Sequence, residues 1–283
     1  MREFKNRKSS STWMVKRGLF WVVLIIILGF FLFPPVWLLS TSLKNFKDAF
    51  AIPPKIIFTP TFENYAYVFS NGDFARYILN SIVISFVSTF ICMLLGVPGA
   101  YAIACFEFKR KKDLSFFILS TRIAPPIMSL LPLYIIFNKL ELIGSRFPLI
   151  IMYILMNLPL VIWIMPVYFR EIPLELREAA IIDGCSELKV FWKVMIPLVR
   201  SGLAATSILC IIQAWNEFLF ALVLSGNDSQ TLPVAVTSFM TFQGTQWGPL
   251  SAAGTIIMIP MIIFGFMVQK SFVKGMTLGA VKG

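Results

Sequence analysis

The residues best suited to chemistry lie in one charged stretch between two long apolar segments. The residues of this stretch that share a distinctive spacing are Glu178, Ala179, Ala180, Asp183, Gly184 and Pro197, the last thirteen positions after the glycine. Small alanines with high helix propensity allow another surface to approach a helix closely. A carboxylate beside them can pair with a basic or amide group on that surface. The pattern therefore favours docking of another protein.

The segment 170–200 has the pattern of two short helices joined by a hinge. Pro173 suits a first helical turn, where its missing N–H costs nothing. Gly184 can adopt a left-handed conformation and end that helix. Ser186 can cap a second helix, with Glu187 in its first turn. The residues expected to form the apolar face of the second helix and then end the unit are Phe191, Trp192, Val194 and Pro197.

The composition of the chain places this stretch in a membrane protein. Of 283 residues, 58% are hydrophobic and 14% are charged, with a mean hydropathy of +0.80. A soluble domain cannot bury that much apolar surface. The chain has no histidine, and its four cysteines (Cys92, Cys105, Cys185 and Cys210) form no C-x-x-C pair. A metal site and a disulfide framework are therefore not expected.

Six apolar segments are long enough to cross a hydrocarbon core of about 30 Å as helices. They are Leu19–Ser40, Tyr77–Cys105, Leu114–Asn138, Phe147–Phe169, Gly202–Leu224 and Leu250–Gln269. The first is too long for the apolar region of a signal peptide and no small-residue cleavage site follows it, so we expect it to be retained. The fold class predicted is all-α, a polytopic membrane protein with six transmembrane helices.

Basic residues orient these helices. Of 25 Lys and Arg residues, 18 lie in the termini and in the loops 106–113 and 170–200, and 6 lie in the loops on the other side. The cytoplasmic loops of membrane proteins carry an excess of Lys and Arg, so both termini and the Glu178 loop are expected in the cytoplasm. The net charge of +11 follows from this distribution, and no basic face with interleaved aromatics indicates nucleic-acid binding. The expected organisation is an N-terminal region over 1–76, a helical core over 77–272 containing the loop 170–200, and a cytoplasmic tail over 273–283.

The longest external segment, 41–76, is rich in proline and aromatic residues. Prolines at this density disfavour a continuous helix, but a short amphipathic helix over Phe62–Phe69 is compatible with the sequence. Two interpretations stay open. The segment is either a contact for an external protein or a connector whose aromatic rings lie at the bilayer surface.

Several polar residues fall inside the apolar segments. They are Arg122, Asn157, Gln213, Asn216 and Glu217. Such groups are costly in a bilayer and are expected to face a cavity or a partner. One interpretation is a solute pathway, with Trp163 and Trp215 supplying aromatic faces. The other is structural, with interhelical hydrogen bonds or an Arg122–Glu217 ion pair.

The motif from Glu178 to Pro197 resembles the E-A-A-x3-G-x9-I-x-L-P signature of ABC importer permeases. Val194 and Ile196 replace its isoleucine and leucine. Three further stretches resemble maltose-type sugar permeases, and the likeness spans nearly the whole chain. They are Arg122 to Pro126 with Leu131-Pro132-Leu133-Tyr134, Trp215-Asn216-Glu217-Phe218, and the ending from Gly275 to Gly283.

This resemblance implies a type I ABC importer permease fold in a bacterial inner membrane. It also implies two ATPase subunits docked on the 170–200 loop, a second and different permease as heterodimer partner, and an external solute-binding protein. The substrate implied is a sugar, with an oligosaccharide as the first candidate; a non-sugar solute is the alternative. The chain has no P-loop, so it is not expected to be an enzyme or to hold a cofactor, and ATP and Mg²⁺ would be bound by the ATPase. A secondary transporter would need carboxylates at mid-membrane, and Glu217 is the only candidate for one. A membrane enzyme would need a nucleophile with a base, and no group of residues in the sequence supplies that pair.

Overall fold

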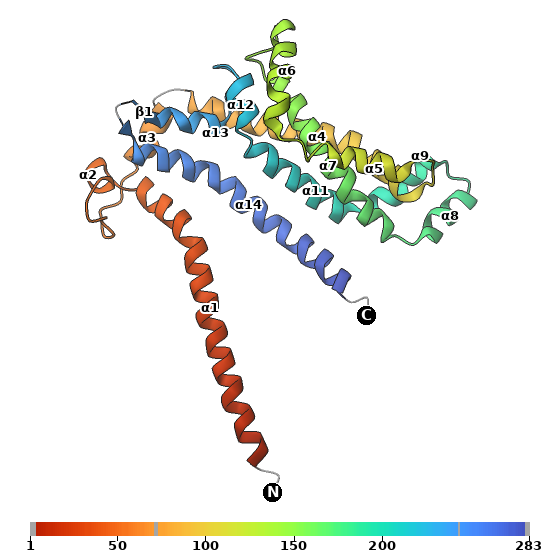
Figure 1. Cartoon of the computed structure of the whole chain (residues 1–283), viewed down its shortest axis with the longest axis horizontal. Coiled ribbons are helices and arrows are strands. Elements are labelled where there is room, and N and C mark those ends of the chain that lie inside the picture. The colour runs from red at the N-terminus through yellow and green to blue at the C-terminus, as the bar shows by residue number, and fades with distance from the viewer. Residues whose placement is uncertain (1–3, 71–72, 243, 281–283) are drawn as a thin grey trace. The chain divides into compact units, whose positions relative to one another are not determined.

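The computed structural model describes residues 4–70, 73–242 and 244–280, and helices make up most of them (Figure 1). Contacts divide the chain into two units. One is formed by residues 1–70 and 239–256, and the other by residues 71–238 and 257–283. The first unit is therefore assembled from two segments that are far apart in the sequence.

The first unit begins with the long helix α1. Its elements are α1 (Phe4–Ser42), α2 (Phe46–Ala49), α3 (Glu63–Ser70), β1 (Met240–Thr241), β2 (Gly244–Thr245) and the start of α14 (Trp247–Ala280). Asn64 ties α3 to the end of α1 because its side-chain amide donates to the carbonyls of Ser42 and Lys44, at 2.9 and 2.7 Å. The short helix expected over Phe62–Phe69 is confirmed by α3. The antiparallel pair β1–β2 is a small exception to the all-helical prediction.

Helix α1 makes little contact with the rest of its unit. In its most apolar stretch of 18 residues, none is buried against the described part of the chain. Phe30 and Phe31, for example, are 75% and 69% exposed. The apolar surface of α1 is thus not covered by the rest of its own unit.

The second unit is the larger helical bundle. Its long elements are α4 (Phe74–Cys105), α5 (Lys111–Ser120), α6 (Pro126–Lys139), α7 (Phe147–Arg170) and α11 (Arg200–Trp215). Its short elements are α8 (Leu174–Ile182), α9 (Glu187–Val190), a π-helix (Phe191–Met195), α10 (Ile196–Leu198), α12 (Leu219–Leu224), α13 (Leu232–Ala235) and a 3₁₀ turn (Val236–Phe239). The later part of α14 also belongs to this unit.

The core of the bundle is the packing of α4 along α7, with α11 against both. Glycines make this contact close. A Cβ at Gly96 of α4 would lie 2.7 Å from Cγ1 of Val161, and one at Gly202 of α11 would lie 2.4 Å from the ring of Tyr168. Small residues at helix crossings allow backbones to approach in a membrane, where packing replaces the hydrophobic effect as the main attraction between helices.

Four helices are long and apolar enough to cross a bilayer. They are Lys16–Ser42, Phe74–Cys105, Phe147–Arg170 and Trp247–Gln269. A fifth crossing is formed if Glu187–Leu198 and Arg200–Trp215, which meet at 79°, are one bent span. Pro126–Lys139 is a shorter apolar helix. The polytopic helical architecture is confirmed, whereas the count of six spans is not.

Two of the predicted spans are interrupted, so neither is one continuous helix. The segment Leu114–Asn138 is broken between α5 and α6, because Pro125 and Pro126 cannot continue the helix that ends at Ser120. The segment Gly202–Leu224 is broken between α11 and α12, where no proline or glycine marks the interruption. Both breaks expose polar residues at the depth of the apolar helices.

Candidate functional site

The segment 170–200 forms the two helices that its sequence predicts, at one end of the second unit (Figure 1). Pro173 caps α8, one position before the helical turn in which it was expected. Gly184 has φ +82°, the left-handed conformation predicted for the residue that ends this helix. Ser186 occupies the N-cap position of α9, but its side chain makes no capping hydrogen bond.

Beyond α9 the chain differs from the prediction. The helix continues as a π-helix, and the apolar face is only partly formed, because Phe191 is buried while Trp192 is 52% exposed. Pro197 lies inside α10, and the chain turns by 79° at Val199 before α11 begins. The bend, and not the proline itself, therefore marks the end of the segment.

A network that the sequence did not reveal holds α8 and α9 together. The Arg177 guanidinium forms an ion pair with Glu187 and lies 4.8 Å from the centroid of the Phe106 ring. The Tyr101 hydroxyl at the end of α4 donates to Glu187 at 3.2 Å. Burial alone would lower the pKa of Arg177, but Tyr101 and Glu187 outweigh it and raise this pKa above its ordinary value. The two helices are thus fixed to α4 by a permanently charged group.

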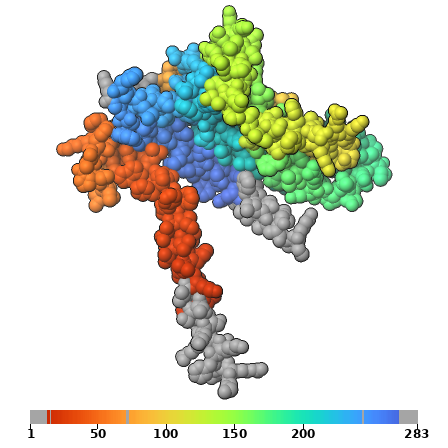
Figure 2. Space-filling view, in the orientation of Figure 1, coloured from red at the N-terminus to blue at the C-terminus, as the bar shows by residue number. Residues whose placement is uncertain are grey.

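The outer surface of the segment carries the residues with the motif spacing. Glu178, Ala179, Asp183, Gly184 and Pro197 are exposed, and Ala180 is half-buried. Two apolar side chains stand out beside them: Ile182 is 85% exposed and Leu188 is 74% exposed. In the space-filling view this segment projects at the end of the second unit, next to α5 (Figure 2). The exposed apolar side chains were missed because the motif was defined by its charged and small residues.

Replacing Gly184 by valine is expected to uncouple this surface from the bundle. A side chain at φ +82° costs about 1 kcal/mol or more, and no atom lies within 4 Å of the new Cβ, so the effect acts through the backbone that joins α8 to α9. If the segment couples transport to an ATPase, as the resemblance implies, we expect the amount of solute moved per ATP hydrolysed to fall in proteoliposomes of the assembled complex. Gly265→Val, at an equally open position without a positive φ, is the control. Equal coupling ratios in both variants would contradict the hinge.

A cavity of about 1000 Å³ lies where the two interrupted spans meet. Four of the five predicted pathway residues line it: Arg122, Gln213, Asn216 and Glu217. Arg122, Gln213 and Asn216 are exposed. In the described part of the chain, no ion pair joins Arg122 to an acidic residue. The guanidinium is therefore available to a ligand in the cavity.

Glu217 has a structural role at the same place. Its carboxylate accepts the backbone N–H groups of Phe220 and Ala221, at 2.9 and 3.1 Å, and the hydroxyl of Tyr153 at 3.0 Å. The first two bonds satisfy donors at the start of α12, which otherwise have no partner within the helix. The acidic side chain thus acts as the cap that allows the helix to restart after the break. The Arg122–Glu217 ion pair, one of the alternatives left open by the sequence, is not formed.

The remaining pathway candidates lie elsewhere. Asn157 is buried between α7 and α11, where its amide donates to the carbonyl of Cys210 at 3.3 Å. Trp215 is buried and donates to the carbonyl of Ile257 at 3.3 Å, and Trp163 does not line the cavity. The aromatic faces in the cavity come from Phe117, Phe218 and Phe220 instead. The tryptophans were misplaced because their helix faces could not be read from uniformly apolar segments.

Removal of the Glu217 cap is expected to destabilise the bundle. Glu217→Leu leaves two buried N–H donors without an acceptor, at a cost of about 1–3 kcal/mol each. The variant should therefore accumulate less in the membrane and unfold at a lower temperature in detergent. Glu217→Gln keeps an acceptor oxygen and should lose much less. A leucine variant as stable as the wild type would show that the carboxylate does not cap α12.

Interrupted helices around a largely apolar cavity that holds a few polar side chains, together with an exposed segment that carries the predicted docking motif, are typical of a transport subunit. The chain belongs to the family described as binding-protein-dependent transport system inner membrane component, which matches residues 96–278.

Similar proteins support this assignment over the full length of the chain. A probable ABC transporter permease of Sinorhizobium fredii is 40% identical and covers 97% of this chain and 99% of its own. The trehalose transport system permease SugB of Mycobacterium tuberculosis is 37% identical over 95% and 99%. The diacetylchitobiose uptake system permease DasC of Streptomyces coelicolor is 32% identical over 95% and 100%.

The fold is also that of a solved importer. A chain in the crystal structure of a bacterial ABC transporter that imports the acidic polysaccharide alginate matches with a TM-score of 0.74. The identity is 24%, and the match covers 93% of this chain and 97% of the other. The predicted ABC importer permease fold is therefore confirmed.

Proposed function

We propose that this chain is a membrane-spanning subunit of an ATP-driven importer and that its solute is a sugar, most simply an oligosaccharide. The relatives named for trehalose and diacetylchitobiose uptake favour a sugar over the non-sugar alternative. The observation that carries the proposal within this chain is the cavity lined by Arg122, Gln213 and Asn216. Amide and guanidinium groups donate hydrogen bonds of the kind that hydroxyl-rich solutes accept.

The energy is supplied by other subunits in this proposal. Two ATPase subunits, which bind ATP and Mg²⁺, dock on the exposed surface of α8 and α9, where Glu178 pairs with a basic or amide group and Ile182 and Leu188 enter an apolar recess. A soluble binding protein delivers the sugar from outside. The second permease is a different chain, and the exposed apolar surface of α1 packs against it.

A transport assay with a panel of sugars tests the solute. The assembled transporter, reconstituted with its binding protein, should hydrolyse ATP faster in the presence of one sugar or a small group of related sugars. Stimulation by amino acids or inorganic ions, with no response to any sugar, would exclude the proposed substrate class. Failure to co-purify with an ATPase would exclude the importer itself.

The orientation proposed has both termini and the segment 170–200 in the cytoplasm of a bacterial cell. A cysteine at Asn227 should react with an impermeant thiol reagent added to intact cells, and a cysteine at Lys189 should react only after lysis. The charge distribution supports this orientation, because 18 basic residues lie on the same side of the membrane as the segment 170–200, and basic residues are enriched on the cytoplasmic side. The reverse pattern of labelling would place the docking surface outside and remove it from contact with any ATPase.

A further inference from the structure

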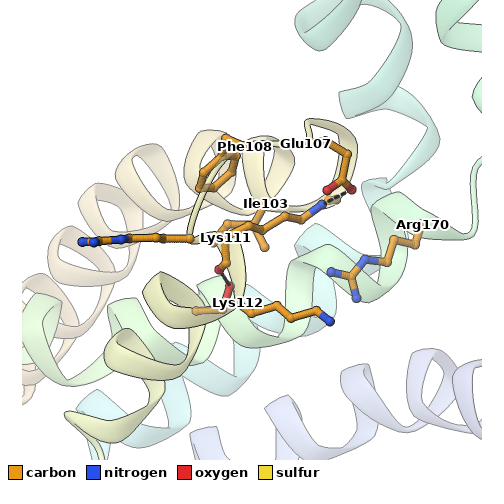
Figure 3. A pocket seen from close by; sticks show the side chains of 9 residues that line it. Ile103, Glu107, Phe108, Lys111, Lys112 and Arg170 are labelled. Atoms are coloured by element: carbon orange, nitrogen blue, oxygen red, sulfur yellow. Dashed lines mark hydrogen bonds and ion pairs between the residues drawn. The ribbon is translucent and has the colours of Figure 1, made fainter.

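A second cavity, of about 840 Å³, lies at the end of the bundle where α4, α5 and α7 approach one another. Four cations line it: Arg110, Lys111, Lys112 and Arg170. The only carboxylate in its lining is that of Glu107. Figure 3 shows Lys112 and Arg170 extending to the same side, with the Lys111–Glu107 pair beside them. This cavity shares no lining residue with the cavity lined by Arg122.

The charge of this basic cavity is largely uncompensated. Lys111 is already paired within the protein, because its ammonium donates to Glu107 and to the carbonyl of Phe106, at 2.8 and 2.9 Å. That hydrogen bond and the charge of Lys111 hold the pKa of Glu107 below its ordinary value, so the pair stays ionised. In the described residues no ion pair involves Arg110, Lys112 or Arg170. Three positive charges therefore face the cavity without a partner.

An apolar groove continues from the basic cavity along the helices. It has a volume of about 220 Å³ and shares Ile103, Ser115 and Arg170 with the cavity. Beyond these residues its lining is apolar and includes Leu119, Ile162 and Trp163. The basic cavity thus joins the apolar groove at three shared residues. Together they match the polarity of an amphipathic anion, which has a charged headgroup and an apolar chain.

The position of the two compartments fits a membrane surface. Helices α4 and α7, both long enough to cross a bilayer, end at Cys105 and Arg170. The basic cavity therefore lies at the level of the lipid headgroups, and the groove extends toward the hydrocarbon. Basic pockets between membrane helices attract anionic headgroups at this level. A free anion would have no use for the groove, and an acidic protein segment would not enter the apolar part.

We propose that this site binds an anionic phospholipid, with its phosphodiester held by Lys112 and Arg170 and one acyl chain in the groove beside Ile162. The inference rests on the membrane placement that is part of the proposed function. The basic cavity is separate from the cavity lined by Arg122, whereas the groove shares Ile118 and Pro159 with that cavity. Lipid binding can be measured without a transport assay, so the result does not depend on the identity of the solute.

The test uses the assembled transporter in nanodiscs with equal amounts of phosphatidylglycerol and phosphatidylcholine. Native mass spectrometry then measures the ratio of the two lipids that remain bound. Arg170→Gln and Lys112→Gln should each lower the preference for phosphatidylglycerol about fivefold. Lys109→Gln removes a charge from the same loop without touching the cavity and should change the ratio little. Ile162→Trp fills the groove, keeps every charge, and should also reduce retention of phosphatidylglycerol.

Three results would overturn the proposal. An effect of Lys109→Gln equal to that of Arg170→Gln would mean that surface charge in general attracts the lipid. Displacement of phosphatidylglycerol by inorganic phosphate, with no effect of Ile162→Trp, would indicate a site for free anions. Loss of the ATPase subunit from the Arg170 and Lys112 variants, with the lipid ratio unchanged, would identify a protein as the ligand. The phosphate competition uses the wild-type complex, so the proposal stays testable if a variant fails to assemble.

Discussion

Serine at both Ile182 and Leu188 is expected to abolish ATP-driven uptake while the chain still inserts in the membrane. These two side chains are 85% and 74% exposed on the docking segment. Burial of an isoleucine or leucine side chain contributes about 1.5–3 kcal/mol, so losing both should weaken binding of the ATPase by about 100-fold or more. The bundle should be unaffected, because neither side chain is buried within it.

The measurement is the amount of ATPase retained by the tagged permease, together with uptake at matched expression. Glu175→Gln is the control, since Glu175 is exposed in the first turn of the same helix and carries no apolar surface. Retention and uptake at wild-type levels in the double serine variant would show that the ATPase does not dock on this surface.

The second large effect is expected at Arg122. Leucine there removes an exposed guanidinium that lines the 1000 Å³ cavity and has no acidic partner in the described residues. A hydrogen bond from a charged group contributes about 1.5–3 kcal/mol, so one lost contact should reduce transport roughly 10- to 100-fold at limiting solute. Folding should change little, because no interaction within the bundle is broken.

Comparison with Arg122→Lys separates charge from geometry. A lysine keeps the positive charge but loses the planar set of donors, so it should restore part of the activity if electrostatic attraction contributes. Uptake is measured with the radiolabelled solute at equal amounts of membrane-inserted protein. If uptake by the leucine variant equals that of the wild type, Arg122 lies outside the pathway.

Local sequence signals predicted the parts of the fold that local chemistry determines. Gly184 was correctly expected in a left-handed conformation, because few other residues adopt it without strain. The ends of α4 and α7 were predicted within a few residues, since an uninterrupted apolar stretch of that length forms a single helix in lipid. The motif from Glu178 to Pro197 could be recognised for the same reason, as it depends on residues that are close in sequence, and its role in docking stays a prediction.

Features that depend on distant partners were not predicted. The break between α11 and α12 is stabilised by Glu217. The third hydrogen-bond donor to its carboxylate, Tyr153, lies 64 positions earlier in the chain. The network of Arg177 joins residues from α4, α8 and α9. In a segment that is apolar on all sides, hydrophobic periodicity does not show which face meets a neighbour. The roles of Glu217, Trp163 and Trp215 were therefore uncertain or misassigned from the sequence.

The isolation of α1 has a consequence for the synthesis of the protein. Lipid chains are as apolar as the side chains of α1, so this helix is stable in the bilayer before any other part of the chain exists. About 240 residues follow Ser42, and at 5–20 residues per second they take roughly 10 to 50 s to translate. During that time α1 is able to anchor the growing chain in the membrane. Insertion of α1 thus does not require the bundle, and a fault in one step does not by itself prevent the other.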